Sequence, residues 1–194
     1  MQYINKRRYS IITFIMIMTI GLFIGCEKET EKIRGDIVSS TSVLTYTPAD
    51  LEILINNGDL DAELEYSVET IKIVYYTLDQ HGKSVKASGA LMVPQSAQEN
   101  PLLCLNHGTE TKRTMVASVS PLYSVEGVMG LILGSRGYLA CVPDYLGFGV
   151  SNQIHPYCHA KSNAVAVIDF IRAAYSYCED NNITLNGQLF LTGY

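Results

Sequence analysis

The sequence predicts an α/β domain in which helices cover both faces of a mostly parallel sheet. Short continuous apolar runs, typical of strands buried on both faces, alternate with helix-length segments. The composition, with 47% hydrophobic and 17% charged residues, is that of a globular protein with a packed core. It excludes disordered, collagen-like and disulfide-dense chains.

Residues 1–25 resemble the signal peptide of a bacterial lipoprotein. Basic residues at positions 6–8 precede an apolar stretch over 11–25, which is shorter than the roughly 18 residues that span a bilayer. The stretch ends at Cys26, and a cysteine after a small residue resembles a lipobox. We therefore expect an exported protein, lipidated at Cys26 and anchored to a membrane of the cell envelope, with a flexible tether over 26–44. A plain secretory signal or an uncleaved anchor is the alternative.

The first expected elements are a helix and a hairpin. Thr47 offers an N-cap, and proline at the first helical position and Asp50 at the third support a helix that stops at Asn57. The β-rich runs 67–77 and 85–93 follow, joined by a polar turn, and are expected to pair as antiparallel strands.

The remaining elements are expected to form the parallel part of the sheet. Apolar runs at 102–105 and 138–142 read as buried strands, and an apolar segment around 125–133 reads as the helix between them. A longer helix is expected at about 159–180, where apolar residues recur every three or four positions. A last apolar strand is expected at 188–192.

Ligands bind at the carboxyl ends of parallel strands, so the loops there are the candidate site. In the first loop His107, Gly108 and Thr109 follow a buried strand, and a glycine there lets backbone N–H groups turn into a cleft to stabilise an oxyanion. A plain turn, with the histidine hydrogen-bonded to nearby backbone, is the alternative.

The second loop contains Asp144, Tyr145, Gly147 and Gly149. The aspartate can accept backbone N–H bonds within the turn, while the glycines permit dihedrals that a side chain would forbid. A dinucleotide loop is disfavoured because Asn152 stands where its third glycine belongs.

The two loops, in this order and spacing, resemble the α/β-hydrolase superfamily, and within it the secreted lipase and esterase group, over about residues 45–194. The resemblance implies that the Thr109 N–H is an oxyanion donor, that His107 and Gly108 shape its loop, and that the second loop lies beside the site. It also implies that Gly193 and Tyr194 begin the nucleophile elbow G-x-S-x-G.

The sequence ends at this point of the elbow. Because the family places serine, acid and histidine in that order, we expect residues 45–194 to be the N-terminal part of the fold, truncated after about strand five. Residues 1–194 alone are expected to be inactive, because they lack the nucleophile, acid and base. Neither Ser135 nor Ser151 stands in an alternative elbow.

The expected activity of the parent protein is acyl transfer by a serine hydrolase on a small-molecule or lipid ester. A serine peptidase of the same fold and a non-catalytic surface lipoprotein remain open. Nucleic acid is not an expected partner of a chain with a net charge of −5. No cofactor or metal is expected: His155, Cys158 and His159 lack a fourth ligand, and Pro156 keeps the histidines off one helix face. No disulfide is expected.

Overall fold

The computed structural model describes residues 32–56 and 63–193. The predicted signal peptide, the predicted lipidation site Cys26 and the elbow residue Tyr194 lie outside these residues. Within the described part, no helix has both the length and the apolar character needed to cross a membrane.

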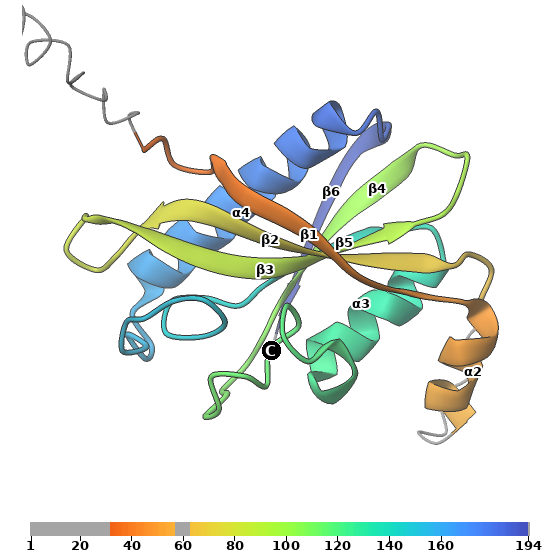
Figure 1. The fold of residues 1–194 in the computed structure, drawn as a ribbon, viewed down its shortest axis with the longest axis horizontal. Helices are drawn as coiled ribbons and strands as arrows, with labels where there is room; N and C mark the ends of the chain where they lie inside the picture. Colours follow the sequence, from red (N-terminus) through yellow and green to blue (C-terminus); the bar gives the residue numbers. More distant parts are fainter. Residues whose placement is uncertain (1–31, 57–62, 194) are drawn as a thin grey trace, which may run out of the picture. The chain divides into compact units, whose positions relative to one another are not determined.

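Six strands and four helical segments make up the described fold (Figure 1). In chain order they are β1 (Ile37–Tyr46), α2 (Pro48–Asn56), β2 (Val68–Leu78), β3 (Ser84–Pro94), β4 (Asn100–Asn106), the 3-10 turn η2 (Pro121–Tyr123), α3 (Val125–Ser135), β5 (Leu139–Pro143), α4 (Ala160–Asp180) and β6 (Leu185–Gly193). Each helix and strand predicted from the sequence is confirmed, with bounds shifted by a few residues.

The strands form one mixed sheet in the order β1-β2-β3-β5-β4-β6. β1, β2, β3 and β5 pair antiparallel in succession, whereas β4 is parallel to both β5 and β6. The predicted hairpin is β2–β3, and its turn is closed by the Asp79 carboxylate, which accepts backbone N–H bonds from His81 and Lys83 at 2.9 Å. The structure thus has the predicted α/β class, but the described sheet is mixed where a mostly parallel one was predicted, because three of its five strand pairings are antiparallel.

Strand β1 corrects the predicted tether. The tether was placed over residues 26–44, with the domain beginning at 45, but residues 37–46 pair with β2 along the edge of the sheet. Most β1 side chains are exposed, so the strand lacks the apolar alternation by which buried strands are recognised. The tether prediction is therefore wrong for residues 37–44.

Both faces of the sheet are covered, as predicted. Helix α4 packs on one face, where Phe170 lies 5.2 Å from the Tyr75 ring, centroid to centroid. Helix α3 packs on the other face, against β3 and β5, and α2 contacts α3 (Figure 1). Leu51 of α2 and Leu131 of α3 are fully buried in the apolar cluster on this side. These two apolar layers fix the strand ends that carry the candidate loops.

Candidate active site

His107 joins the two predicted loops. Its Nδ1 lies 2.8 Å from the carbonyl oxygen of Gly108, and its Nε2 lies 3.0 Å from the carbonyl oxygen of Asp144. The ring also stacks against Tyr145, with 4.2 Å between ring centroids, and meets Phe148 edge-on at 5.4 Å. Each ring nitrogen thus faces a backbone carbonyl oxygen, and the one that carries the proton donates to it, which fits the predicted role of His107 in shaping the first loop.

Thr109 follows at the rim of a small polar hollow. Its hydroxyl lies 3.1 Å from the Tyr157 hydroxyl, and its backbone N–H donates no hydrogen bond to any other described residue. The hollow has a volume of about 210 Å³ and is also lined by His155 and Asn163. The Asn163 Oδ1 is buried and has no hydrogen-bond partner within the described ranges. Donor and acceptor groups are therefore available to a ligand here.

Asp144 is fully buried at the end of β5. Its Oδ2 accepts hydrogen bonds from the Ser88 hydroxyl at 2.5 Å and from the Ser118 hydroxyl, and its Oδ1 accepts from the Ser118 backbone N–H at 3.2 Å. The predicted hydrogen bonds from backbone N–H groups of its own turn are therefore replaced by bonds from Ser88 on β3 and from Ser118. The turn N–H of Val150 donates instead to the Ser88 hydroxyl, at 3.1 Å.

Opposing effects act on the Asp144 carboxyl. Burial raises its pKa, while the hydrogen bonds from Ser118 and Ser88 and the nearby charge of His107 lower it. The net pKa is raised above the ordinary value. The hydroxyl and amide donors therefore offset only part of the cost of burying the ionised carboxyl, and no basic side chain is bonded to it in the described part of the chain.

The second loop needs glycine at two positions, as predicted. Gly149 has φ +56°, and a Cβ there would lie 2.2 Å from the Ser88 Oγ and 2.3 Å from the Asp144 Oδ2. Gly147 has φ +90°, and a Cβ there would lie 2.5 Å from the backbone nitrogen of His155. Both positions thus combine left-handed backbone with a close approach that a side chain would prevent.

Arg113 is a further anchor of the second loop. Its guanidinium donates to the carbonyl oxygens of Ser151 and Gln153, and its own carbonyl accepts from the Gly149 N–H at 3.0 Å. Sequence reasoning missed Arg113, Ser88 and Ser118. Only Ser88 carried a signal, as a polar residue within an apolar strand.

The histidines beyond the second loop have structural roles. His155 Nδ1 lies 2.7 Å from the carbonyl oxygen of Leu146, and His159 caps α4 by accepting from the Ser162 N–H at 3.3 Å. His159 is thus the N-cap of α4. Cys158 is an exposed free thiol. In the described ranges, no group of three or more His, Cys, Asp and Glu side chains could hold a metal ion.

Ser135 and Ser151, which the sequence excludes from an alternative elbow, are both buried. Ser135 is 0% exposed, and its hydroxyl accepts a hydrogen bond from the Glu65 N–H at 3.1 Å. Ser151 is 1% exposed, and its hydroxyl has no partner among the described residues. A nucleophilic serine needs both an accessible oxygen and an adjacent base, so neither residue fits this role.

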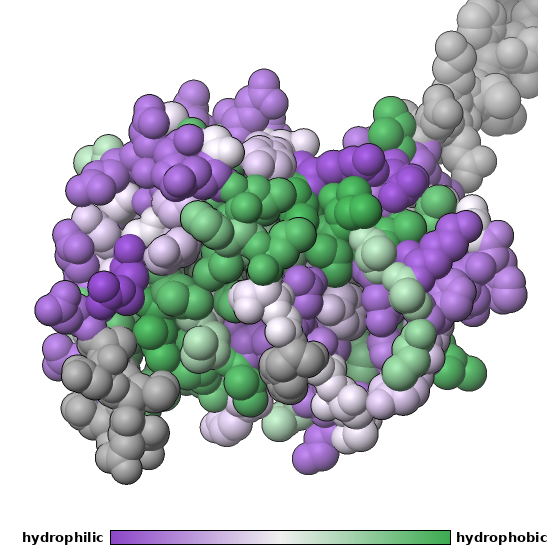
Figure 2. Space-filling model, turned by 180° about the vertical axis from the view of Figure 1, so that it is seen from behind, coloured by the Kyte–Doolittle hydropathy of each residue, from purple (hydrophilic) through white to green (hydrophobic). Residues whose placement is uncertain are grey.

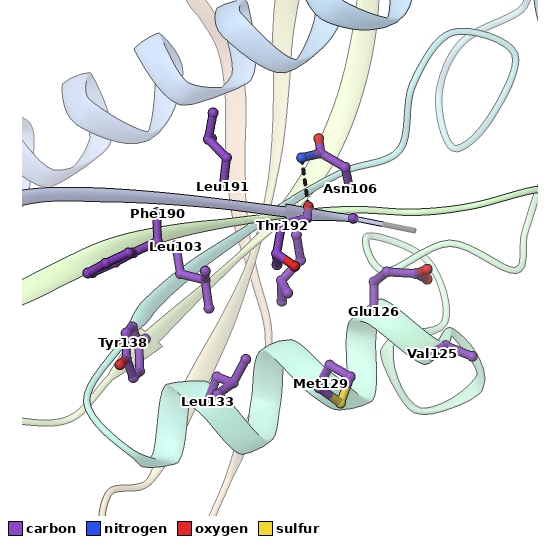
Figure 3. A pocket seen from close by; sticks show the side chains of 12 residues that line it. Leu103, Asn106, Val125, Glu126, Met129, Leu133, Tyr138, Phe190, Leu191 and Thr192 are labelled. Carbon is purple, nitrogen blue, oxygen red and sulfur yellow. Dashed lines mark hydrogen bonds between the residues drawn. The ribbon is translucent and has the colours of Figure 1, made fainter. Parts of the chain in front are cut away.

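Gly193, the start of the predicted elbow, lies beside the first loop. It is in register with Asn106 on β4, and the Asn106 side-chain amide donates to the Thr192 carbonyl at 2.9 Å (Figure 3). The three predicted parts of the site, which are the two loops and the elbow start, thus stand at the carboxyl ends of three adjacent strands.

An apolar hollow of about 680 Å³ lies between β6 and α3. Phe190 and Thr192 point into it from β6, while Leu191 points to the opposite face of the sheet (Figure 3). Leu189, Phe190 and Leu191 are 42%, 44% and 63% exposed. Apolar side chains form a continuous area on the side of the molecule shown in Figure 2.

Solved structures of known proteins share this fold. The esterase LipA from Xanthomonas oryzae, described as degrading the rice cell wall, matches 84% of this chain with a TM-score of 0.73 and 32% sequence identity. A Legionella pneumophila protein assigned as a hydrolase matches 81% with a TM-score of 0.73 and 25% identity. Candida antarctica lipase A, at 16% identity and a TM-score of 0.55, shares the fold alone.

The matched region is part of a larger fold in these proteins. The chain spans 42% of the length of the LipA structure and 43% of that of the Legionella protein. No protein-family model matches the chain, and no curated protein sequence matches it. The similarity shows an α/β-hydrolase fold that resembles lipases and esterases.

Proposed function

We propose that this chain supplies the oxyanion side of a serine hydrolase that cleaves carboxylic esters by acyl transfer. The observation that carries the proposal is the Thr109 backbone N–H, which has no partner in the described part and stands at the sheet edge where Gly193 begins the predicted elbow. The similarity to an esterase at 32% identity supports ester over peptide substrates.

The proposed chemistry follows from this placement. A serine directly after Tyr194 would attack the ester carbonyl carbon, passing its proton to a histidine further along the chain. The resulting oxyanion would accept hydrogen bonds from the Thr109 N–H and from the N–H that follows the serine. The histidine would then protonate the departing alcohol, and water would release the acid from the acyl-enzyme in the same way.

The test begins with the coding sequence beyond residue 194. The proposal expects Ser-x-Gly next, and expects the protein extended through the rest of the fold to hydrolyse p-nitrophenyl acetate or octanoate. The polypeptide of residues 1–194 is the control, and a fluorophosphonate probe should leave it unlabelled. Turnover of aminoacyl amides without ester turnover would favour the peptidase, and a stop codon would favour the binding lipoprotein.

For the location we propose export and lipidation at Cys26, on the strength of the lipobox-like end of the apolar stretch. Mass spectrometry of the protein expressed in a bacterium should find a diacylglyceryl group on an N-terminal Cys26, with membrane-bound protein in cell fractions. A Cys26→Ser variant should lose the lipid and the membrane association. An unmodified N-terminus at another residue in the unsubstituted protein would contradict the proposal.

A further inference from the structure

We infer that Asp144 is a positioning residue that holds the oxyanion loop, residues 107–109, in its working shape. Its effect on catalysis rests on the proposed function, whereas its effect on the loop can be measured separately. The aspartate contributes through both its backbone and its carboxylate, and these contacts reach separate parts of the chain.

The backbone of Asp144 fixes the start of the loop. Its carbonyl oxygen lies 3.0 Å from the His107 Nε2, and its N–H donates to the Ser88 carbonyl on β3 at 2.9 Å. His107 is further packed between Tyr145 and Phe148, so the ring has little freedom to leave this carbonyl. The first residue of the loop is therefore tied to the end of β5.

The carboxylate of Asp144 fixes the segment that follows the loop. Ser118 donates to it through both its backbone N–H and its hydroxyl. The stretch from His107 to Ser118 is thus clamped at both ends by one residue, and Thr109 lies within it. An oxyanion donor must be held in place before the reaction to stabilise the developing charge, so this clamp bears directly on the Thr109 N–H.

The contacts of Asp144 use both of its carboxyl oxygens as acceptors. Its Oδ1 accepts from the Ser118 N–H, and its Oδ2 accepts from the hydroxyls of Ser118 and Ser88, the second of which also accepts from the Val150 N–H. An asparagine keeps only one of the two oxygens, so either the Ser118 N–H loses its acceptor or both hydroxyls must rotate to accept from the NH₂ group. Asp144→Asn therefore loosens the clamp while keeping the volume of the side chain.

Asp169 offers a matched control. Its carboxylate is also fully buried, and like that of Asp144 it accepts a hydrogen bond from a hydroxyl, that of Thr77 at 2.8 Å. It also accepts hydrogen bonds from the guanidinium groups of Arg34 and Arg172. It lies on α4, and none of these contacts involves the candidate loops. Asp169→Asn thus reports the cost of losing a buried carboxylate that does not touch the oxyanion loop.

The first measurement is hydrogen exchange at the amides of residues 107–118 in the extended protein. Asp144→Asn should speed their exchange at least about tenfold relative to the unsubstituted protein, whereas Asp169→Asn should leave it within about twofold. This readout does not require ester hydrolysis. Equal exchange in the two variants would overturn the inference, even if both were destabilised.

The second measurement is steady-state ester hydrolysis. Asp144→Asn should lower kcat about tenfold or more with KM nearly unchanged, because a misplaced donor costs more in the transition state than in the ground state. Asp169→Asn should retain kcat below its melting temperature. If Asp144→Asn does not fold, Ser118→Ala keeps the carboxylate and should show a smaller loss of the same kind. If the unsubstituted extended protein does not hydrolyse esters, the proposed function is contradicted. The hydrogen-exchange measurement then still tests whether Asp144 holds the loop.

Discussion

Replacing Thr109 by proline in the extended protein should lower kcat for ester hydrolysis about 100- to 1,000-fold, the usual effect of losing one oxyanion donor. Proline removes the backbone N–H, which is the group that the proposed mechanism uses. This N–H donates no hydrogen bond to any described residue, so its removal breaks no hydrogen bond within the described structure. The loss should appear in kcat, measured with p-nitrophenyl esters at saturating substrate.

Thr109→Ala separates the N–H from the side chain. Alanine keeps the donor but removes the hydroxyl, which lies 3.1 Å from that of Tyr157. It should retain kcat within about tenfold, because one exposed hydroxyl contact is worth roughly 0.5–1.5 kcal/mol at most. If the proline and alanine variants were equally active, Thr109 would not be the oxyanion donor.

Gly149→Ala should lower the free energy of unfolding by about 2–5 kcal/mol, combining the cost of left-handed backbone with that of overpacking. The φ of +56° disfavours any side chain, and the new Cβ would stand 2.2 Å from the Ser88 Oγ and 2.3 Å from the Asp144 Oδ2. Those atoms must move, and their mutual hydrogen bond would be disturbed. Urea unfolding at neutral pH measures the change.

Gly82→Ala is the matched control for this substitution. Gly82 has φ +79° in the turn between β2 and β3, but a Cβ there would meet no atom within 4 Å. It should therefore cost only the backbone part, about 1–2 kcal/mol. Equal losses in the two variants would mean that the contact with Ser88 and Asp144 does not constrain position 149.

The sequence was most informative where one physical requirement dominated. Continuous apolar runs predicted β4 and β5, because strands covered on both faces admit few polar residues. The same pattern predicted β6, although most of its side chains are exposed in the described part of the chain. Strand β1 could not be predicted in this way, since it lies at the sheet edge with Val43 and Leu44 about half exposed. Its stability comes from pairing with β2, and no local pattern reports such a partner.

The candidate site could also be predicted only in part, where the sequence itself shows a local constraint. Glycines at 147 and 149 revealed a constrained turn, and His107 stood where a loop after a buried strand was expected. Ser118 and Arg113 lie in an irregular segment, and what they bind depends on how that segment folds back over β5. Contacts between parts of the chain that lie far apart carry no signature in spacing or periodicity.

The position of β4 between β5 and β6 has a consequence for protein synthesis. β4 leaves the ribosome first, while β6 follows roughly 80 residues later, a delay of about 4–16 s at the usual translation rate of roughly 5–20 residues per second. Throughout that interval one side of β4 has backbone groups without their native partner. Until residue 185 emerges, this edge of β4 is therefore open to pairing with a neighbouring polypeptide.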